Sequence, residues 1–433
     1  MVIKMKIRVL LVTYFPLRDD LSTGNTLLNV FRGLEDNFEF YNVYIKEGIP
    51  NNCIVNSYYN ISEKELLKSV LKRNLVGSKV FFENINNTHL DNGIYYNKAR
   101  QLRWDSLLLA QDLIGLIGCI NYKELDSYVS EVKPDIIFGP LGRVPLPNKI
   151  MVYLSKKFSI PIISYLWDDH YSLKKFSISF FFWIRTFVER GYIKECANHS
   201  EFMFTIIDEM KNEYERNFNK KCSVLNKSYD FISRPPSKEI IFPIKMLYMG
   251  NIGGGREKVL IELVKKIVKI NDTEQKYYLD IYTSTPVSKK LREKLNIQGC
   301  SSLNKAVPQT QLLGIMSGAN ILVHVTPMDL KNRLLERLSF STKVVDYLYS
   351  GKCILSIGGE TATSKYLKKN DAAIVINNIN EIDIKLMDIM NNKEIIKDFE
   401  LKAWSCGKRN HNKQDTKDII IKLFSDVKER KII

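Results

Sequence analysis

Residues 339–358, SFSTKVVDYLYSGKCILSIG, combine a polar turn, a short helix and an apolar strand. Ser341 or Thr342 is expected to cap the helix, because a hydroxyl there accepts a hydrogen bond from a free backbone N–H. Gly351 stands where a left-handed residue would end the helix. The apolar run at 354–357 then predicts a buried strand. A helix that leads directly into a buried strand is typical of α/β proteins.

The start of this helix is suited to an anion. Lys343 and Asp346 lie three positions apart and therefore share a helix face. Free N–H groups, hydroxyls and a lysine attract negative charge, and a carboxylate one turn later accepts hydrogen bonds from hydroxyls. A sugar nucleotide presents both kinds of group. The alternative is an ordinary capped helix with solvated charges.

The rest of the chain alternates strands and helices in the same manner, which predicts parallel, doubly wound sheets. Two such series follow one another, and a proline-containing stretch, RPPSK at 234–238, separates them. We therefore predict an α/β protein with two tandem Rossmann-like domains. The expected boundaries are 1–230 for the first domain, 231–243 for a linker, 244–410 for the second domain and 411–433 for a C-terminal helix. Predicted strands lie at 6–13, 136–138, 160–167, 222–225, 245–249, 277–282, 321–325, 354–357 and 372–376. The main predicted helices lie at 104–120, 149–158, 205–217, 257–270, 288–295, 308–317, 382–390 and 413–427, and the leucine-rich helix at 104–120 is expected to be buried.

Composition narrows the possible functions. The 433 residues carry a net charge of +16, which favours nucleic acid, an anionic membrane surface or phosphorylated ligands as partners. The seven cysteines are scattered without a CxxC pair, so we expect neither a disulfide framework nor a zinc site, and a reducing cytoplasm. No run approaches the roughly 20 apolar residues of a membrane-spanning helix. Nucleic-acid binding rests on charge alone, because no basic-aromatic module is recognisable.

Three further stretches carry candidate chemistry. The loop GNIGGGREK at 250–258 follows a strand and opens a helix, so its N–H groups can converge on a phosphate; a flexible turn is the alternative. Asp168, Asp169 and His170 end another strand, where an acid or imidazole could act as a base or orient a hydroxyl. Solvated loop acids are the competing interpretation. The run KKFSISFFFWIR at 174–185 fits either an interfacial membrane segment or a buried helix.

These motifs support a family resemblance. The C-terminal half resembles the nucleotide-sugar domain of GT-B glycosyltransferases, in particular the large retaining bacterial family (group 1, family 4-like). Three pieces match in order: the glycine loop, the segment VPQTQL at 307–312, and TKVVDYLYSGK at 342–352. The last is similar to the family signature K-x-x-E-Y-L-x-x-G-K-P. The N-terminal half matches in outline only, through the loop STGN at 22–25 and the 168–170 triplet.

The resemblance implies roles for individual residues. Asp346 takes the place of the glutamate that binds the nucleotide ribose, and Lys343 with the Ser341 and Thr342 amides would face the diphosphate or the sugar. Arg256 would be the basic residue after the glycine loop. The remaining implied donor contacts are Gly24, Asn25, Gly253, Gly254, Lys258 and Val307, and the implied catalytic group is His170 with Asp168 and Asp169.

Three positions depart from the family pattern. The second family carboxylate, eight residues before Asp346, is Leu338 here. Asn251 stands in place of the usual arginine, and Cys353 in place of the usual proline. The first two departures weaken the assignment of donor and sugar contacts. The nucleotide half of the expected site is therefore better supported than the sugar half.

The resemblance further implies a function. We expect a hexosyltransferase that moves a sugar from a nucleotide-sugar donor to a saccharide or lipid-linked saccharide acceptor in bacterial surface polysaccharide synthesis. It would be retaining, would need no metal or other cofactor, and would work in a cleft between its two domains, with the last helix crossing back to the first domain. The enzyme would be cytoplasmic and peripheral at the inner face of the plasma membrane. The alternatives are a non-catalytic nucleotide-sugar-binding or partner protein, and a sugar-nucleotide epimerase.

Overall fold

The computed structural model describes residues 5–19, 22–81 and 104–430 of the chain. It divides into two compact units, each built around its own sheet. Unit 1 combines Met1–Asn226 with Thr416–Ile433, and unit 2 consists of Lys227–Asp415. Residues 231–243, which the sequence predicts as a linker, fall within unit 2.

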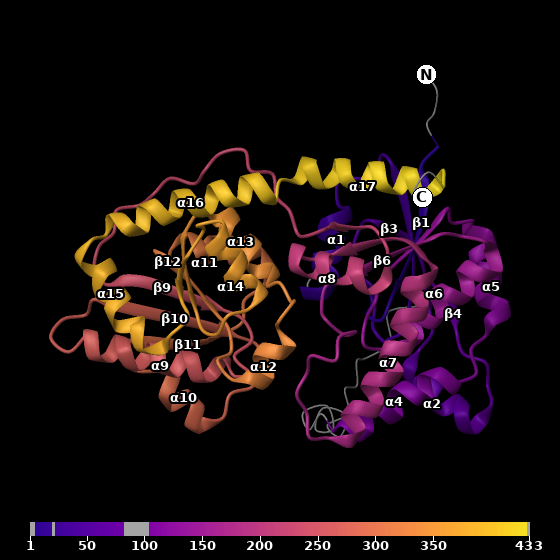
Figure 1. Ribbon diagram of the computed structural model, residues 1–433, viewed down its shortest axis with the longest axis horizontal. Coiled ribbons are helices and arrows are strands. Elements are labelled where there is room, and N and C mark those ends of the chain that lie inside the picture. Colours follow the sequence, from indigo (N-terminus) through magenta and orange to yellow (C-terminus); the bar gives the residue numbers. More distant parts are fainter. Residues whose placement is uncertain (1–4, 20–21, 82–103, 431–433) are drawn as a thin grey trace. The chain divides into compact units, whose positions relative to one another are not determined.

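Unit 1 contains an eight-stranded sheet in the order β4-β3-β2-β1-β5-β6-β7-β8, in which β4 alone runs antiparallel to its neighbour (Figure 1). The order reverses between β1 and β5, which lie side by side although far apart in sequence. The strands are β1 Ile7–Thr13, β2 Phe38–Tyr44, β3 Val55–Asn60, β4 Ser78–Val80, β5 Ile136–Pro140, β6 Ile162–Leu166, β7 Ser200–Thr205 and β8 Cys222–Val224; the helices are α1 Ser22–Phe31, α2 Glu63–Lys72, α4 Asp105–Ile117, α5 Tyr122–Val132, α6 Pro145–Phe158, α7 Phe180–His199 and α8 Asp208–Phe218.

Unit 2 contains a six-stranded, fully parallel sheet in the order β11-β10-β9-β12-β13-β14. Its order reverses between β9 and β12. Helices α9, α10 and α15 pack together on one side of the sheet, and α13 packs with α16 on the other. The strands are β9 Ile244–Met249, β10 Tyr277–Thr283, β11 Ser301–Lys305, β12 Ile321–Val325, β13 Cys353–Ile357 and β14 Ile374–Ile376; the helices are α9 Arg256–Ile270, α10 Lys289–Leu295, α11 Gln309–Ser317, α12 Leu330–Leu335, α13 Thr342–Ser350, α14 Ala362–Lys369, the 3-10 turn Ile379–Glu381, α15 Ile382–Asn391 and α16 Glu394–Asn410.

The last helix, α17 (Lys413–Lys428), completes the core of unit 1. Its Phe424 is fully buried and lies among four aromatic rings of that unit, with centroid distances of 5.4 to 6.4 Å. The four rings come from α1, β2, β5 and β7: Phe31, Phe38, Phe138 and Phe204.

The predicted fold class is confirmed, because both units are α/β structures built on parallel strands. The sequence missed elements that lack an apolar run. Strand β11, SSLNK, is polar because it lies at a sheet edge with one neighbouring strand. The expectation that residues 104–120 form a buried helix was correct only in part: α4 covers Asp105–Ile117 and buries Leu109, but Leu107, Leu113 and Ile117 on one side of it are exposed.

The stretch at 339–358 forms the predicted helix α13 and strand β13, with one correction at the cap. Ser341 is the N-cap residue, but its hydroxyl makes no capping bond, and Thr342 already lies within the helix. The backbone N–H of Ser341 instead donates to Oγ1 of Thr363, 3.0 Å away, so this end of α13 is fixed by a neighbouring helix. Gly351 ends the helix in the predicted left-handed conformation, with φ of 61°.

None of the helices among the described residues combines the length and the apolarity that a bilayer crossing requires.

Candidate functional site

The glycine loop between β9 and α9 lies beside the reversal point of the unit 2 sheet, where open α/β sheets bind ligands. Gly250, Gly254 and Gly255 all have positive φ, from 69° to 153°, a conformation that other residues rarely adopt. The loop is held by Asn251, whose Oδ1 accepts hydrogen bonds from the Gly253 N–H at 2.7 Å and from the Thr285 hydroxyl at 3.0 Å. Asn251, a departure from the family pattern, thus shapes the loop.

Lys343 brings the start of α13 to this loop. Its Nζ lies so close to Gly250 that a Cβ on Gly250 would collide with it. Two features of the sequence, 93 positions apart, therefore meet in one place. The surrounding protein and the Arg256 guanidinium lower the pKa of Lys343 to about 8, although solvent still reaches the residue. An ammonium in such a position gains more from a nearby phosphate than a fully solvated one does.

Arg256, the first residue of α9, is fixed in place by two contacts. Its Nη1 donates to the Gly253 carbonyl at 3.1 Å, and its Nη2 forms a close ion pair with Glu336. Glu336 is a functional candidate that the sequence analysis did not identify. Glu336 lies two positions before Leu338. Leu338 is buried and stands at the position where the signature of the resembled family has a carboxylate. An acid so close to position 338 was the sequence signal that could have identified Glu336.

Asp346 lies one turn after Lys343 and is already engaged by its own unit. Its Oδ1 accepts a close hydrogen bond from Lys227 and a bond of 2.6 Å from the Tyr229 hydroxyl. Tyr229 also stacks on Tyr349 of α13, with the ring centroids 4.2 Å apart. These contacts fix the carboxylate against the chain segment that begins unit 2.

The other predicted donor contacts of unit 2 are less closely grouped. Gly253 and Gly254 belong to the loop that Arg256 touches, and Ser341 and Thr342 form the start of α13. Lys258 is exposed on the first turn of α9. Val307 is half-buried and follows the edge strand β11. The structure thus brings Gly250, Arg256 and Lys343 together.

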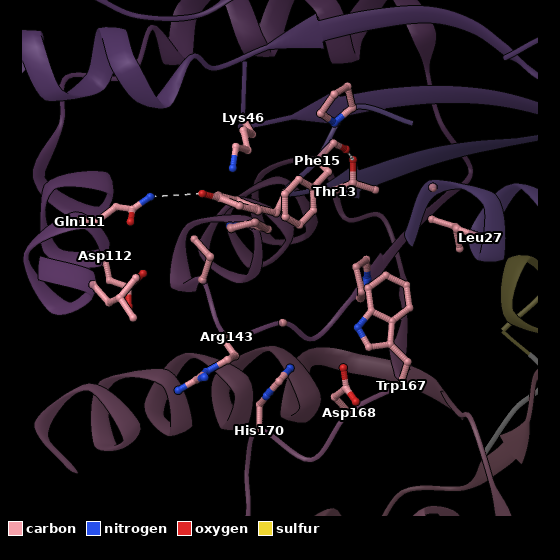
Figure 2. Close-up of a pocket in the computed structure, with 18 of the residues that line it drawn as sticks. Thr13, Phe15, Leu27, Lys46, Gln111, Asp112, Arg143, Trp167, Asp168 and His170 are labelled. Atoms are coloured by element: carbon pink, nitrogen blue, oxygen red, sulfur yellow. Dashed lines mark hydrogen bonds between the residues drawn. The ribbon is translucent and has the colours of Figure 1, made fainter. Parts of the chain in front are cut away.

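Unit 1 contains a cavity of about 550 Å³ at the carboxyl ends of its strands β1, β5 and β6 (Figure 2). Gly24, Asp168 and His170 of the predicted site line it. Figure 2 shows Arg143, His170 and Asp168 along one wall, with Lys46 and Gln111 across from them. The aromatic and aliphatic part of the lining comprises Tyr14, Phe15, Pro16, Leu17, Leu27, Trp104, Leu107, Leu108, Pro140, Val144, Pro147 and Trp167.

Two predicted residues of unit 1 do not line this cavity. Asp169 is buried and accepts hydrogen bonds from the Ser172 N–H at 2.9 Å and from the Tyr214 hydroxyl at 2.8 Å, so it holds its own loop. Asn25 donates to the backbone carbonyl of Asp19 at 3.0 Å. All three hydrogen bonds hold loop segments of unit 1 in place.

Ion pairs with buried members form part of the cavity wall, because Asp112, Arg143 and Arg185 line the cavity. Glu189 of α7 is fully buried and lies 3.2 Å from the Nε atoms of both Arg143 and Arg185. Arg185 also donates to Asp112 of α4 at 2.6 Å. Burial, with the charges of Arg143 and Lys175, holds the pKa of His170 well below its ordinary value. His170 is therefore neutral at pH 7 and can accept a proton or a hydrogen bond.

Over the described residues 5–19, 22–81 and 104–430, no three His, Cys, Asp or Glu side chains lie close enough together to hold a metal ion.

The pKa of Lys343 gives a first prediction. A nucleoside diphosphate keeps a constant charge above about pH 7, because the second phosphate pKa is near 6. Lys343 loses its proton as the pH rises through about 8. We expect nucleoside diphosphate affinity to fall between pH 7 and pH 9 in the wild type, and this fall to be absent in Lys343→Arg, whose side chain stays charged. Isothermal titration across this range measures it. Equal pH dependence in both proteins would contradict a role for Lys343.

Comparisons with known proteins give structural matches alone. No family model matches the sequence, and no curated protein matches it. The structure is similar to Anabaena Alr3699/HepE solved with UDP and glucose, at a TM-score of 0.63 and 8% identity, covering 97% of this chain and 100% of the other. It is also similar to a mutant of S. aureus TarM solved with fondaparinux, alpha-GlcNAc-glycerol and UDP, at a TM-score of 0.61 and 13% identity, covering 97% and 100%.

A third match is the UDP-GlcNAc 2-epimerase from Neisseria meningitidis bound to UDP-GlcNAc, at a TM-score of 0.53 and 10% identity, covering 97% of this chain and 100% of the other. At such identities the likeness establishes architecture. Each match extends over nearly the whole of both chains, and so over both units. The chain therefore has the two-domain α/β architecture called the GT-B fold.

Proposed function

We propose that the chain is a glycosyltransferase that takes a sugar from a nucleotide-sugar donor. The observation that carries this proposal is the contact between Lys343 and Gly250, beside an Arg256 that Glu336 holds in place. An ammonium, a guanidinium and a glycine loop that opens a helix together suit a diphosphate. The fold matches, which include proteins solved with UDP or a UDP-sugar, support the same ligand class.

In the proposed reaction the bond between the sugar C1 and the diphosphate oxygen breaks, and the leaving nucleoside diphosphate keeps the electron pair. A hydroxyl oxygen of the acceptor forms the new bond to C1, and its proton passes to the leaving phosphate or to solvent. Arg256 and Lys343 would stabilise the charge that develops on the diphosphate, a role that needs no metal ion. We propose retention of the anomeric configuration as part of this function, and Asp346 as the group for the ribose hydroxyls.

The unit 1 cavity is proposed to hold the acceptor, a saccharide or a lipid-linked saccharide. Its lining combines aromatic rings with polar groups, as carbohydrate sites require. The neutral His170 and the nearby Asp168 are the proposed groups for orienting the acceptor hydroxyl. The net charge of +16 supports peripheral attachment to an anionic membrane, in bacterial surface polysaccharide synthesis.

The decisive experiment is calorimetric titration with UDP, GDP, ADP and dTDP. We expect Lys343→Ala to bind the preferred nucleotide about 10- to 100-fold more weakly, since a hydrogen bond to a charged group contributes roughly 1.5–3 kcal/mol. The matched control is Lys269→Ala, an exposed lysine at the far end of α9, which should bind as the wild type does. If the wild type bound none of the four, the proposal would be wrong.

An epimerase is the second candidate, because one fold match is a UDP-GlcNAc 2-epimerase. The two reactions differ in their products. A transferase releases a nucleoside diphosphate, and the release rises when an acceptor is added, whereas an epimerase returns an intact sugar nucleotide with altered stereochemistry. Nuclear magnetic resonance of the sugar nucleotide after incubation separates them. Binding without any turnover, with membrane extract as acceptor source, would indicate a non-catalytic partner protein.

A further inference from the structure

Three neighbouring helices of unit 1 leave large apolar side chains exposed. We call these residues the apolar surface: Leu67 and Leu71 of α2, Leu107, Leu113 and Ile117 of α4, and Phe180, Phe181 and Phe187 of α7. The exposed fractions reach 88% for Leu71, 65% for Ile117 and 73% for Phe180. Monomeric proteins seldom leave apolar side chains grouped in this way unless the group binds something.

Hydrogen bonds join the three helices side by side, with α4 in the middle. Gln111 of α4 donates to Glu63 of α2 at 2.7 Å, and the next residue, Asp112, accepts from Arg185 of α7 at 2.6 Å. The polar groups of α4 thus point toward its neighbours. Its outer side carries Leu107, Leu113 and Ile117 and bears no charged residue at their spacing. The exposed apolar side chains are therefore carried by three adjacent helices, with α4 between α2 and α7 (Figure 1).

Helix α4 also forms a wall of the cavity. Leu107 is exposed at the apolar surface and at the same time lines the cavity, as does Trp104 just before the helix. Leu108 and Gln111, on the inner side of α4, line the cavity as well. Leu107 therefore connects the cavity to the apolar surface. The apolar part of a molecule bound in the cavity can extend past this side chain onto the apolar surface.

The charges around the apolar surface are mostly positive. Helix α2 and its cap carry four exposed cations, Lys64, Lys68, Lys72 and Arg73. Glu63 accepts from Tyr14 and Gln111, and Glu65 pairs with Lys68, so Lys64, Lys72 and Arg73 are the α2 cations that would meet the headgroups. Apolar side chains beside lysine and arginine fit an anionic lipid surface, where the chains enter the interface and the cations meet the headgroups.

We propose that the apolar surface docks on an anionic lipid bilayer, and that the cavity beside α4 thereby receives a lipid-linked acceptor directly from the membrane. The second half of this proposal rests on the proposed transferase function; the first half does not. The docking surface is α2, α4 and the start of α7 together, which is a larger area than the aromatic run at 174–185. A second copy of the chain is the competing occupant.

The test is co-sedimentation with vesicles of phosphatidylglycerol mixed equally with phosphatidylcholine, and with vesicles of phosphatidylcholine alone. The variant is Leu113→Glu with Ile117→Glu, at exposed positions that do not line the cavity. The matched control is Ile384→Glu with Met387→Glu, exposed on α15 of unit 2. We expect the wild type and the control to bind the mixed vesicles, and the α4 variant to bind at least about 10-fold more weakly, since it loses two apolar insertions and gains two negative charges.

Several results would overturn the docking proposal: a wild type that ignores the mixed vesicles, one that binds phosphatidylcholine alone equally well, or an α4 variant that binds as the control does. Size-exclusion chromatography at equal concentration gives the other contradicting outcome, a wild-type dimer that the α4 variant turns into a monomer without changing vesicle binding. Urea unfolding followed by tryptophan fluorescence shows whether unit 1 of the α4 variant is folded, because Trp104, Trp167 and Trp183 lie in that unit.

Delivery of the acceptor is tested separately. We expect membrane extract to stimulate nucleoside diphosphate release by the wild type and by the α15 control, and this stimulation to be lost in the α4 variant. Acceptor-independent release should be equal in all three proteins. Stimulation that persists in the α4 variant would overturn delivery. Absence of nucleotide binding in the wild type would refute the transferase function while leaving the vesicle result standing.

Discussion

Replacing Glu189 by alanine should lower the free energy of unfolding of unit 1 by about 3–5 kcal/mol. The carboxylate is fully buried and pairs with Arg143 and Arg185, of which Arg185 has a side chain only 7% exposed. Removing the carboxylate leaves the guanidinium of Arg185 in a low-dielectric environment, with Asp112 as its remaining acidic partner in the part of the chain that the structure describes. Urea unfolding followed by tryptophan fluorescence measures the change.

A matched control comes from the same helix. Glu195 of α7 pairs with Lys156 at 3.1 Å, but both side chains are about half exposed. Water screens such a pair, so Glu195→Ala should change stability by no more than about 1 kcal/mol. Equal effects of the two substitutions would show that burial of the Glu189 pairs has no special importance. Three of the four tryptophans, Trp104, Trp167 and Trp183, lie in unit 1, so the fluorescence signal reports mainly on that unit.

Phe424→Ala should destabilise unit 1 by a similar amount, about 3–5 kcal/mol. The ring is fully buried among Phe31, Phe38, Phe138 and Phe204. Its removal leaves a cavity that the surrounding rings cannot close without breaking their contacts on β2, β5 and β7. The same urea experiment measures the effect.

Ile419 of α17 provides the comparison, since it is 37% exposed on the same helix. Ile419→Ala should cost about 1 kcal/mol or less, because little apolar area is lost from the core. A Phe424→Ala protein as stable as Ile419→Ala would contradict the assignment of α17 to the core of unit 1.

The sequence predicted the parts of the fold that local patterns encode. Strands β12 and β13 are largely apolar because both of their faces are buried, and such segments can be recognised without a structure. Gly351 was recognisable because a helix needs a left-handed residue at its end. Edge strand β11 gave no such signal. The outer side of α4 gave a misleading one, since its leucines suggested burial where the structure exposes them.

The candidate site likewise contains residues that local sequence patterns predict and residues that they do not. Lys343 and Arg256 could be predicted because each lies beside a helix start or a glycine loop with a recognisable pattern. The ion-pair partners of the site residues could not be predicted from the sequence. Glu336 is 80 positions from Arg256, and Lys227 is 119 positions from Asp346. Such pairs are set by which strands lie together in the sheet, and no local periodicity records that. The roles of Asp168, Asp169 and His170 stay predictions.

The position of α17 has a consequence for the order in which the chain matures. During translation, residues 5–226 emerge first, yet the ring of Phe424 that fills their core is made only after all of Lys227–Asp415. The unit that begins synthesis first is therefore the second to be completed. In the interval the faces of Phe31, Phe38, Phe138 and Phe204 lack their central partner, and such incomplete apolar surfaces are where chaperones bind and aggregation starts. Unit 2, whose sequence is contiguous, is the unit that needs no later segment of the chain to complete its core.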